Sequence, residues 1–334
     1  MRYMLLIIII LFSINVLFAG KYAGDFLEIG AGVRSLSMGG AFSAVADDGS
    51  AIYWNPSGIA QIRHTEIGLM RAFLYQGLAN YDNLSIVQPL PNDVSIGFHW
   101  TRLSITDIPI FSEEHLVGTV DQRISFPWLN LPATPDGYFS SIDDVFQFAF
   151  AKYSRYELNM GWLFFELPID LYFGANMKYI NRSLYDYTGT GIGFDLSFMS
   201  RFDLGEITEQ AWLGDLSLAA NLQNIGGTTI VWDTDSEHED KILFNTKIGV
   251  ALMQPMEKYQ SKFIISTDYD YVYDGTFHVG FEWIYDDLVS GRLGYYDSNF
   301  SSGLSLKLYQ FILDYAFVTN ALGYTNRIGL RMNL

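Results

Sequence analysis

The stretch from Ile169 to Ile180 has the sequence IDLYFGANMKYI, in which apolar side chains alternate with polar or small ones over most of its length. Successive side chains of a β-strand point to opposite faces, so this stretch has one apolar and one polar face. The same alternation recurs from Tyr324 to Leu334. Strands of about ten residues with an apolar outer and a polar inner face are typical of a membrane β-barrel. The apolar set of the first stretch comprises Ile169, Leu171, Phe173, Ala175, Met177 and Tyr179, and the polar or small set includes Asp170, Gly174, Asn176 and Lys178.

Strand patterns follow one another from residue 63 to residue 334 and predict an all-β fold, a transmembrane antiparallel β-barrel. We expect about fourteen strands, because bacterial single-chain barrels have even strand numbers. The region from Tyr156 to Glu166 has the pattern of a further strand, and we interpret it as a continuation of the fourth strand or a periplasmic hairpin. The expected ranges are 64–74, 79–89, 93–103, 143–154, 169–182, 187–204, 211–225, 241–255, 259–273, 275–286, 288–298, 299–309, 310–319 and 323–334.

Connection lengths alternate between short turns and long links. Such barrels have short periplasmic turns and longer extracellular loops. We therefore expect the links 104–142 and 226–240 outside the cell, and the turns near Pro89, Pro255, Asp286 and Tyr309 in the periplasm. Prolines in the first link argue against strand structure there. We expect this link to fold over the barrel mouth, where Trp128 either contacts a ligand or cargo or simply packs within the loop.

Residues 1–20 resemble a secretory signal peptide, with Arg2 before an apolar run that ends near Ala19 and Gly20. The alternative is a transmembrane anchor, because the run approaches the lower length limit for spanning. No cysteine occurs in the chain, so a lipid-anchored lipoprotein is excluded. An exported barrel of this kind belongs in the outer membrane of a Gram-negative-type bacterium, in contact with its lipid.

Composition and charge exclude several functions. The net charge is −17, whereas nucleic-acid binding needs a basic footprint, so no nucleic-acid partner is expected. Acidic residues between Asp233 and Asp240 suggest a divalent-cation site or a solvated loop, and we favour the loop because EF-hand spacing and its glycine are absent. The five histidines are scattered, and neither G-x-S-x-G nor H-E-x-x-H occurs. We therefore expect no enzyme, no catalytic residues, no cofactor and no metal.

Residues 21–62 differ from the rest, since they are rich in Gly, Ala and Ser. Gly39 and Gly40 permit close backbone approach and positive φ. Asn55 followed by Pro56 predicts an N-cap and a first-turn proline, opening a short helix through Ala60. Small residues with a tight helix suit a segment packed inside a barrel, so we predict a hatch at 21–62 and the barrel at 63–334.

This segment also carries a resemblance to a known family. The sequences VRSLSMGGAF at 33–42 and YWNPSGIA at 53–60 resemble the opening of the PorV/PorQ family, which is related in fold to FadL-type long-chain fatty-acid transporters. Ser57 replaces the usual Ala, and Asn326 replaces the usual His in the closing strand. The chain is thus similar to the family over nearly its whole mature length.

The resemblance implies a fourteen-stranded outer-membrane barrel with an N-terminal hatch. It implies a part in protein export or surface presentation of the type IX secretion kind, with secretion-system proteins or exported cargo as partners. The alternative is FadL-like, hatch-gated transport of a hydrophobic small molecule. Passive membership of an envelope complex is a third hypothesis, because fold alone does not fix function.

Polar residues on the inner face are the candidate lumen residues. One interpretation is a polar conduit or a contact for an anionic ligand. We favour internal ion pairs that hold the hatch, because charges inside a narrow barrel must pair or be solvated. Arg34 of the hatch is then expected to pair with Glu282 or Asp314. The candidates are Asn176, Lys178, Asp195, Asn245, Lys247, Glu282, Lys307, Asp314, Arg327 and Arg331, and the candidate gating residues are Arg34, Gly39, Gly40, Asn55 and Pro56.

Overall fold

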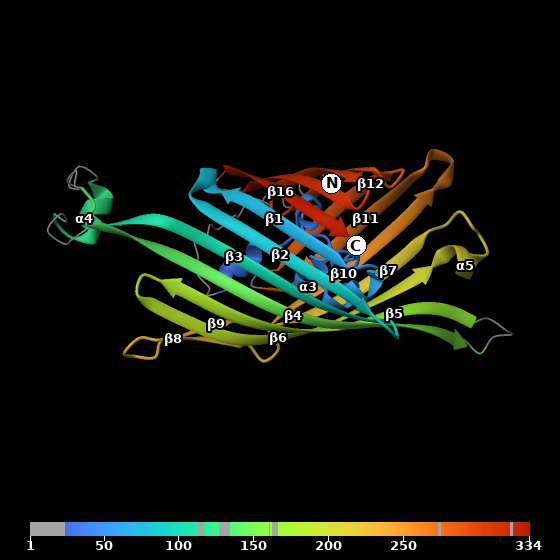
Figure 1. The fold of residues 1–334 in the computed structure, drawn as a ribbon, viewed down its shortest axis with the longest axis horizontal. Coiled ribbons are helices and arrows are strands. Elements are labelled where there is room, and N and C mark those ends of the chain that lie inside the picture. The colour runs from blue at the N-terminus through green and yellow to red at the C-terminus, as the bar shows by residue number, and fades with distance from the viewer. Residues whose placement is uncertain are drawn as a thin grey trace, which may run out of the picture.

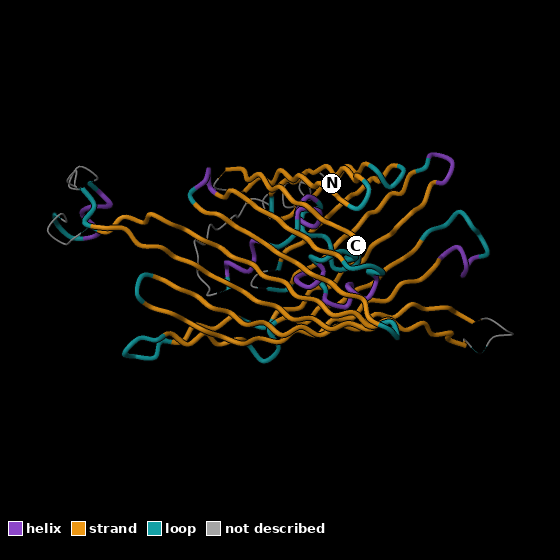
Figure 2. The backbone as a smooth tube through the Cα atoms, viewed as in Figure 1, coloured by secondary structure: helices purple, strands orange, loops and turns teal. Residues whose placement is uncertain are grey.

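A computed structural model describes residues 24–111, 117–126, 134–159, 161, 166–272, 275–320 and 323–334. The predicted signal peptide and Trp128 lie outside the described residues. Long antiparallel strands dominate, as Figures 1 and 2 show. They are β1 (Glu66–Leu74), β2 (Ala79–Leu90), β3 (Val94–Ile110), β4 (Gly137–Asn159), β5 (Glu166–Leu184), β6 (Tyr187–Asp203), β7 (Asp215–Gln223), β8 (Thr228–Trp232), β9 (Glu239–Ile242), β10 (Asn245–Met256), β11 (Ser261–Asp270), β12 (Thr276–Tyr285), β13 (Val289–Tyr296), β14 (Asn299–Leu308), β15 (Phe311–Asn320) and β16 (Gly323–Asn333).

Fourteen of these strands form a closed ring. Each pairs with its neighbour in chain order, β7 pairs with β10, and β16 returns to β1, so no edge is left open. The remaining two, β8 and β9, form a hairpin that extends the sheet from β6. Every predicted strand range overlaps one strand of the ring. The predicted fourteen-stranded antiparallel barrel is therefore confirmed.

The ambiguous region 156–168 divides between two strands of the ring. Strand β4 runs to Asn159 and β5 begins at Glu166, and these two residues are paired. The interpretation as a continuation of the fourth strand is correct, and the described residues contain no fifteenth ring strand there.

The link 104–142 differs from the prediction, because β3 and β4 continue through much of it. Pro109 lies in β3 opposite Tyr138 of β4. Beyond Ser104, β3 no longer pairs with β2, so the proline faces a free edge where no ladder donor is needed. Pro109 therefore did not exclude a strand at its position.

The same link does not cross the barrel mouth in its described part. Figure 1 shows β3 and β4 projecting past the wall as an arm, with helix α4 (Val120–Ser125) at its end. The other long link, 226–240, is likewise not an open loop, since it contains β8 and the start of β9.

The alternation of the sequence matches the two faces of the wall. Phe173 points outward and is 46% exposed, whereas Asn176 points inward and is 3% exposed. The last strand repeats the pattern, with Ile328 outside and Arg327 inside. Within the described residues, the helices are too short or too polar to cross a bilayer.

We call residues 24–62 the N-terminal segment. It contains η1 (Asp25–Ile29), α2 (Val33–Ser37), α3 (Ala51–Trp54) and η2 (Pro56–Gln61). In Figure 1 its blue ribbon lies within the ring of strands. Nearly every residue from Gly30 to Ala60 is buried, so the segment and the inner wall form one packed interior.

Candidate functional site: the barrel interior

Two glycines of the N-terminal segment meet the wall at van der Waals limits. Gly39 has φ 66°, and a Cβ there would lie 2.7 Å from the backbone nitrogen of Tyr295. Gly40 has φ 76°, and its Cβ would lie 3.0 Å from Trp54 and 3.1 Å from His278. Both the positive φ and the space therefore require glycine at these positions.

The Asn55-Pro56 pair begins the helix that the sequence predicts. The Asn55 side chain accepts a hydrogen bond from the Ser57 backbone at 3.2 Å and donates one to the Ser43 carbonyl at 2.7 Å. Pro56 occupies the first turn, where its missing N–H costs nothing. The helix is of the 3-10 type and packs mainly against β4 and β5.

Arg34 joins the segment to the wall. Its Nη2 donates to Glu282 of β12 at 2.7 Å, its Nε donates to the same carboxylate at 3.0 Å, and its Nη1 contacts Asp47. Burial disfavours the charged guanidinium, but Asp47 and Glu282 outweigh it and raise the pKa of Arg34 well above its usual value. Arg34 therefore remains a cation inside the barrel.

Glu282 and Asp314 belong to one network of buried charges. Arg292 of β13 lies 2.6 Å from Glu282 and 3.4 Å from Asp314. Arg331 of β16 lies 2.8 Å from Asp314 and 3.4 Å from Asp48 of the segment. Arg34 thus pairs with Glu282, whereas Asp314 forms its ion pairs with arginines of the strands.

A second group of ion pairs is formed by residues of β5, β6, β10 and β11. Lys178 lies 2.8 Å from Asp195, and Lys247 contacts Asp270. Nearby, Asp268 accepts hydrogen bonds from the backbone of Phe42 at 3.1 Å and of Ser43 at 2.8 Å. Most of the charged lumen candidates are therefore ion-paired, namely Lys178, Asp195, Lys247, Glu282, Asp314 and Arg331.

Arg327 differs from these ion-paired lumen residues. It is 4% exposed, and its Nε and Nη1 have no hydrogen-bond partner among the described residues. The hydroxyl of Tyr81, which is fully buried, also lacks a partner there.

Sequence reasoning missed Arg292, Asp268 and Asp270. The signal was present for Arg292, since it lies opposite Glu282 in the β12–β13 ladder and so shares its inward face. Asp268 and Asp270 alternate with the outward Tyr269 in the same way. Their contacts depend on the packing of distant residues, which strand periodicity does not report.

Backbone groups of the segment are held by polar side chains around the ring. Asn221 of β7 donates to the Trp54 carbonyl at 2.8 Å, and the Ser57 backbone donates to Ser197 of β6 at 2.8 Å. His278 of β12 contacts the Gly39 carbonyl at 2.6 Å. These contacts attach the segment to several sides of the wall at once.

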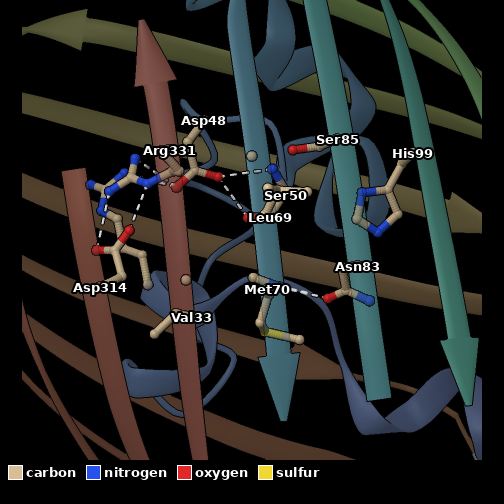
Figure 3. A pocket seen from close by; sticks show the side chains of 14 residues that line it. Val33, Asp48, Ser50, Leu69, Met70, Asn83, Ser85, His99, Asp314 and Arg331 are labelled. Atoms are coloured by element: carbon tan, nitrogen blue, oxygen red, sulfur yellow. Dashed lines mark hydrogen bonds and ion pairs between the residues drawn. The ribbon is translucent and has the colours of Figure 1, made fainter. Parts of the chain in front are cut away.

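The space left between the segment and strands β1, β2, β15 and β16 is small. Figure 3 shows this cavity, which has about 30 Å³ and is lined by polar groups that include Asp48, Asn83, His99 and Arg331. A water molecule needs about 10–15 Å³ of such volume, so the cavity has room for only a few. At this level the segment fills the lumen rather than leaving a channel beside the wall.

We call the barrel end with the β3–β4 arm the loop end, and the opposite end the turn end. Towards the loop end a buried apolar cluster joins the segment to the sheet. There Phe26 of the segment packs with aliphatic side chains of β4, β5, β8 and β9. These side chains are packed together and fill the space between them, and we call the cluster the apolar chamber; it consists of Phe26, Val145, Ile180, Ile230 and Ile242, with Leu27, Leu103 and Trp232 packed against it.

The carboxylates of the described acidic stretch 233–240 do not gather into a cation-binding site. Asp240 accepts a hydrogen bond from the indole of Trp232 at 2.9 Å and lies 4.0 Å from Arg182. Across the described part of the chain, no three potential metal ligands come together.

Comparisons with known proteins identify the fold alone. No protein-family model and no curated protein matches the chain, so the resemblance to PorV/PorQ is not supported. Among solved structures, a deletion mutant of the TodX monoaromatic hydrocarbon channel is 12% identical and covers 91% of this chain and 99% of its own, with a TM-score of 0.50. The Pseudomonas putida toluene transporter TodX is 10% identical and covers 90% and 96%, with a TM-score of 0.49.

A Pseudomonas aeruginosa FadL homologue is 9% identical and covers 91% of this chain and 98% of its own, with a TM-score of 0.46. The shared fold is that of an outer-membrane barrel, and the outward apolar face of the ring agrees with it. The chain is therefore a closed, fourteen-stranded β-barrel of the outer membrane of a Gram-negative-type bacterium.

Proposed function

We propose that this barrel conducts hydrophobic small molecules across the outer membrane and that the N-terminal segment is its gate. The observation that carries the proposal is the apolar chamber, the buried cluster in which Phe26 and Leu27 of the segment pack with aliphatic side chains of the strands. A lumen built only for hydrated solutes would be polar. A cluster of apolar side chains beside the N-terminal segment instead gives a hydrophobic molecule a favourable surface to contact once the segment moves.

The contacts of the segment suit a gate that can open. Arg34, Gly39, Gly40, Asn55 and Pro56 define its fold and its fit against the wall. Many of its links to the strands are hydrogen bonds and ion pairs rather than continuous strand pairing. Water can replace such bonds at modest net cost, so the segment can shift while the barrel stays closed.

The fold comparison favours transport over secretion. One protein with a similar fold is a monoaromatic hydrocarbon channel, and monoaromatic hydrocarbons are hydrophobic small molecules of the kind proposed here. The export hypothesis rested on the PorV/PorQ resemblance, which no family model or curated protein supports. We keep protein export or surface presentation as the second hypothesis, with the projecting β3–β4 arm as the surface that cargo would meet.

Uptake of a hydrophobic fluorescent dye by cells that produce the protein tests the proposal. We expect Ile230→Ser to lower the uptake rate, because it places a hydroxyl in the apolar chamber. Val231→Ser is the matched control, since this neighbouring side chain is 44% exposed and lies outside the chamber. Equal uptake by wild type, Ile230→Ser and cells without the barrel would rule out conduction through the chamber.

A further inference from the structure

A cavity of about 420 Å³ opens at the turn end of the barrel. Its lining combines the N-terminal segment, through Gln61 and Ile62, with wall residues at the ends of strands, such as Glu66 and Asn333. The Arg34–Glu282 contact also borders this cavity, which lies at the end of the barrel opposite the apolar chamber. We call it the basic vestibule.

The charge of the basic vestibule is opposite to that of the chain. Seven basic side chains and four acidic ones line it, which leaves a net charge of +3 in a protein of −17. Chance would favour an acidic lining here, because acidic residues outnumber basic ones by 37 to 20. The basic residues are Arg34, Arg63, Arg201, Lys262, Arg292, Lys307 and Arg331, and the acidic ones are Asp47, Glu66, Glu282 and Asp287.

Part of this positive charge forms no ion pair among the described residues, although the Asp215 carboxylate interacts electrostatically with Arg201 and Lys262. Arg34, Arg292 and Arg331 are engaged by carboxylates on the floor of the vestibule. Among the described residues, by contrast, neither Lys262 nor Lys307 forms an ion pair. Arg201 donates from Nη2 to Gln61, and its Nε is buried without a hydrogen-bond partner in the described chain. Buried donors usually have partners, so this arrangement is suited to accept an anion.

We propose that the basic vestibule binds a small oxyanion with two or more negative charges, held by Arg201, Lys262 and Lys307. Arg201 lies in β6, Lys262 in β11 and Lys307 in β14, so the three charges approach the opening from different parts of the ring. Phosphate and carboxylate groups share the chemistry that such charges recognise. A bound anion would bridge the wall and the N-terminal segment, because Gln61 contacts Arg201. This site is independent of hydrophobic transport through the chamber.

Isothermal titration calorimetry of the folded, detergent-solubilised protein measures the binding of two probes to the site. Inorganic pyrophosphate represents the phosphate class and citrate the carboxylate class, with neutral glycerol as the blank. We expect saturable binding of at least one anion, weakened by added salt because the site is electrostatic. The double variant Arg201→Gln/Lys307→Gln should weaken that binding by about tenfold or more, since it removes two charge-assisted contacts.

A matched variant separates the vestibule from general charge. Lys241→Gln removes one exposed positive charge from β9 at the loop end and should leave the affinity unchanged. Migration of unboiled protein on a denaturing gel shows whether each variant is folded. Absence of anion binding by the wild type, equal affinity in the folded double variant, or equal loss in Lys241→Gln would overturn the proposal. A failure of dye uptake, in contrast, would leave it standing.

Discussion

At the scale of single residues, the direction of a side chain decides what a charge costs. Phe173 faces lipid, whereas Ser290 faces the water-accessible basic vestibule. We expect Phe173→Arg to reduce the stability of the folded barrel by about 2–4 kcal/mol, because charge on the lipid face is costly near the midplane. Ser290→Arg should cost far less. Urea titration of barrels folded into lipid vesicles measures both, and similar costs would mean that the assigned faces are wrong.

Buried and exposed ion pairs should also differ strongly. Glu282 is fully buried and neutralises both Arg34 and Arg292. We expect Glu282→Gln to destabilise the barrel by about 3–5 kcal/mol, because it removes a carboxylate that two buried arginines share and leaves them only partly compensated by Asp47 and Asp314. The control is Glu206→Gln, which breaks the exposed pair with Arg155 and should cost at most about 1 kcal/mol. The same urea titration checks this, and a Glu282→Gln midpoint equal to that of the control would contradict the network.

At the scale of elements, strand periodicity predicted the ring well and its extensions poorly. The period of two placed Lys178 and Asp195 on one inner face, because that face repeats along every strand. It could not place β8 and β9, because β8 pairs with the part of β6 that β7 leaves unpaired, and β9 pairs only with β8. Nor could it predict that Asp268 meets the backbone of Phe42, since that contact joins residues far apart in sequence.

Packing of the N-terminal segment leads to a prediction about its movement. Gly40→Trp should displace the segment, because the added ring meets Trp54 and His278 and packed interiors do not absorb extra volume cheaply. The matched control is Gly226→Trp, since Gly226 has a similar φ of 80° but no heavy atom within 4 Å of the point where a Cβ would lie. We expect only Gly40→Trp to raise dye uptake, with both variants still heat-modifiable. A rise of the same size in both would point to backbone strain rather than to the gate.

At the scale of the whole molecule, the ring of strands should not need the N-terminal segment in order to fold. Every ring strand has two strand neighbours, so the backbone ladder closes without the segment. The strand pairs Glu282–Arg292 and Asp314–Arg331 also remain when the segment is removed. Asp268 would lose its partners Phe42 and Ser43, but water entering the lumen can solvate it. The barrel should therefore fold without its interior segment.

Deletion of residues 21–60 is accordingly the most direct test of the gate. We expect the shortened chain, exported with its own first twenty residues, to reach the outer membrane and to migrate as a folded barrel before boiling. Single-channel recordings in planar bilayers should then show large, steady conductance, whereas the full-length mature chain should show little, because the segment no longer fills the lumen. Glu282→Gln is a useful intermediate, since it weakens the Arg34 attachment without removing any chain. If the folded deletion variant conducts no more than the full-length barrel, the segment is not the gate, and transport through the lumen loses its mechanism in favour of the export hypothesis.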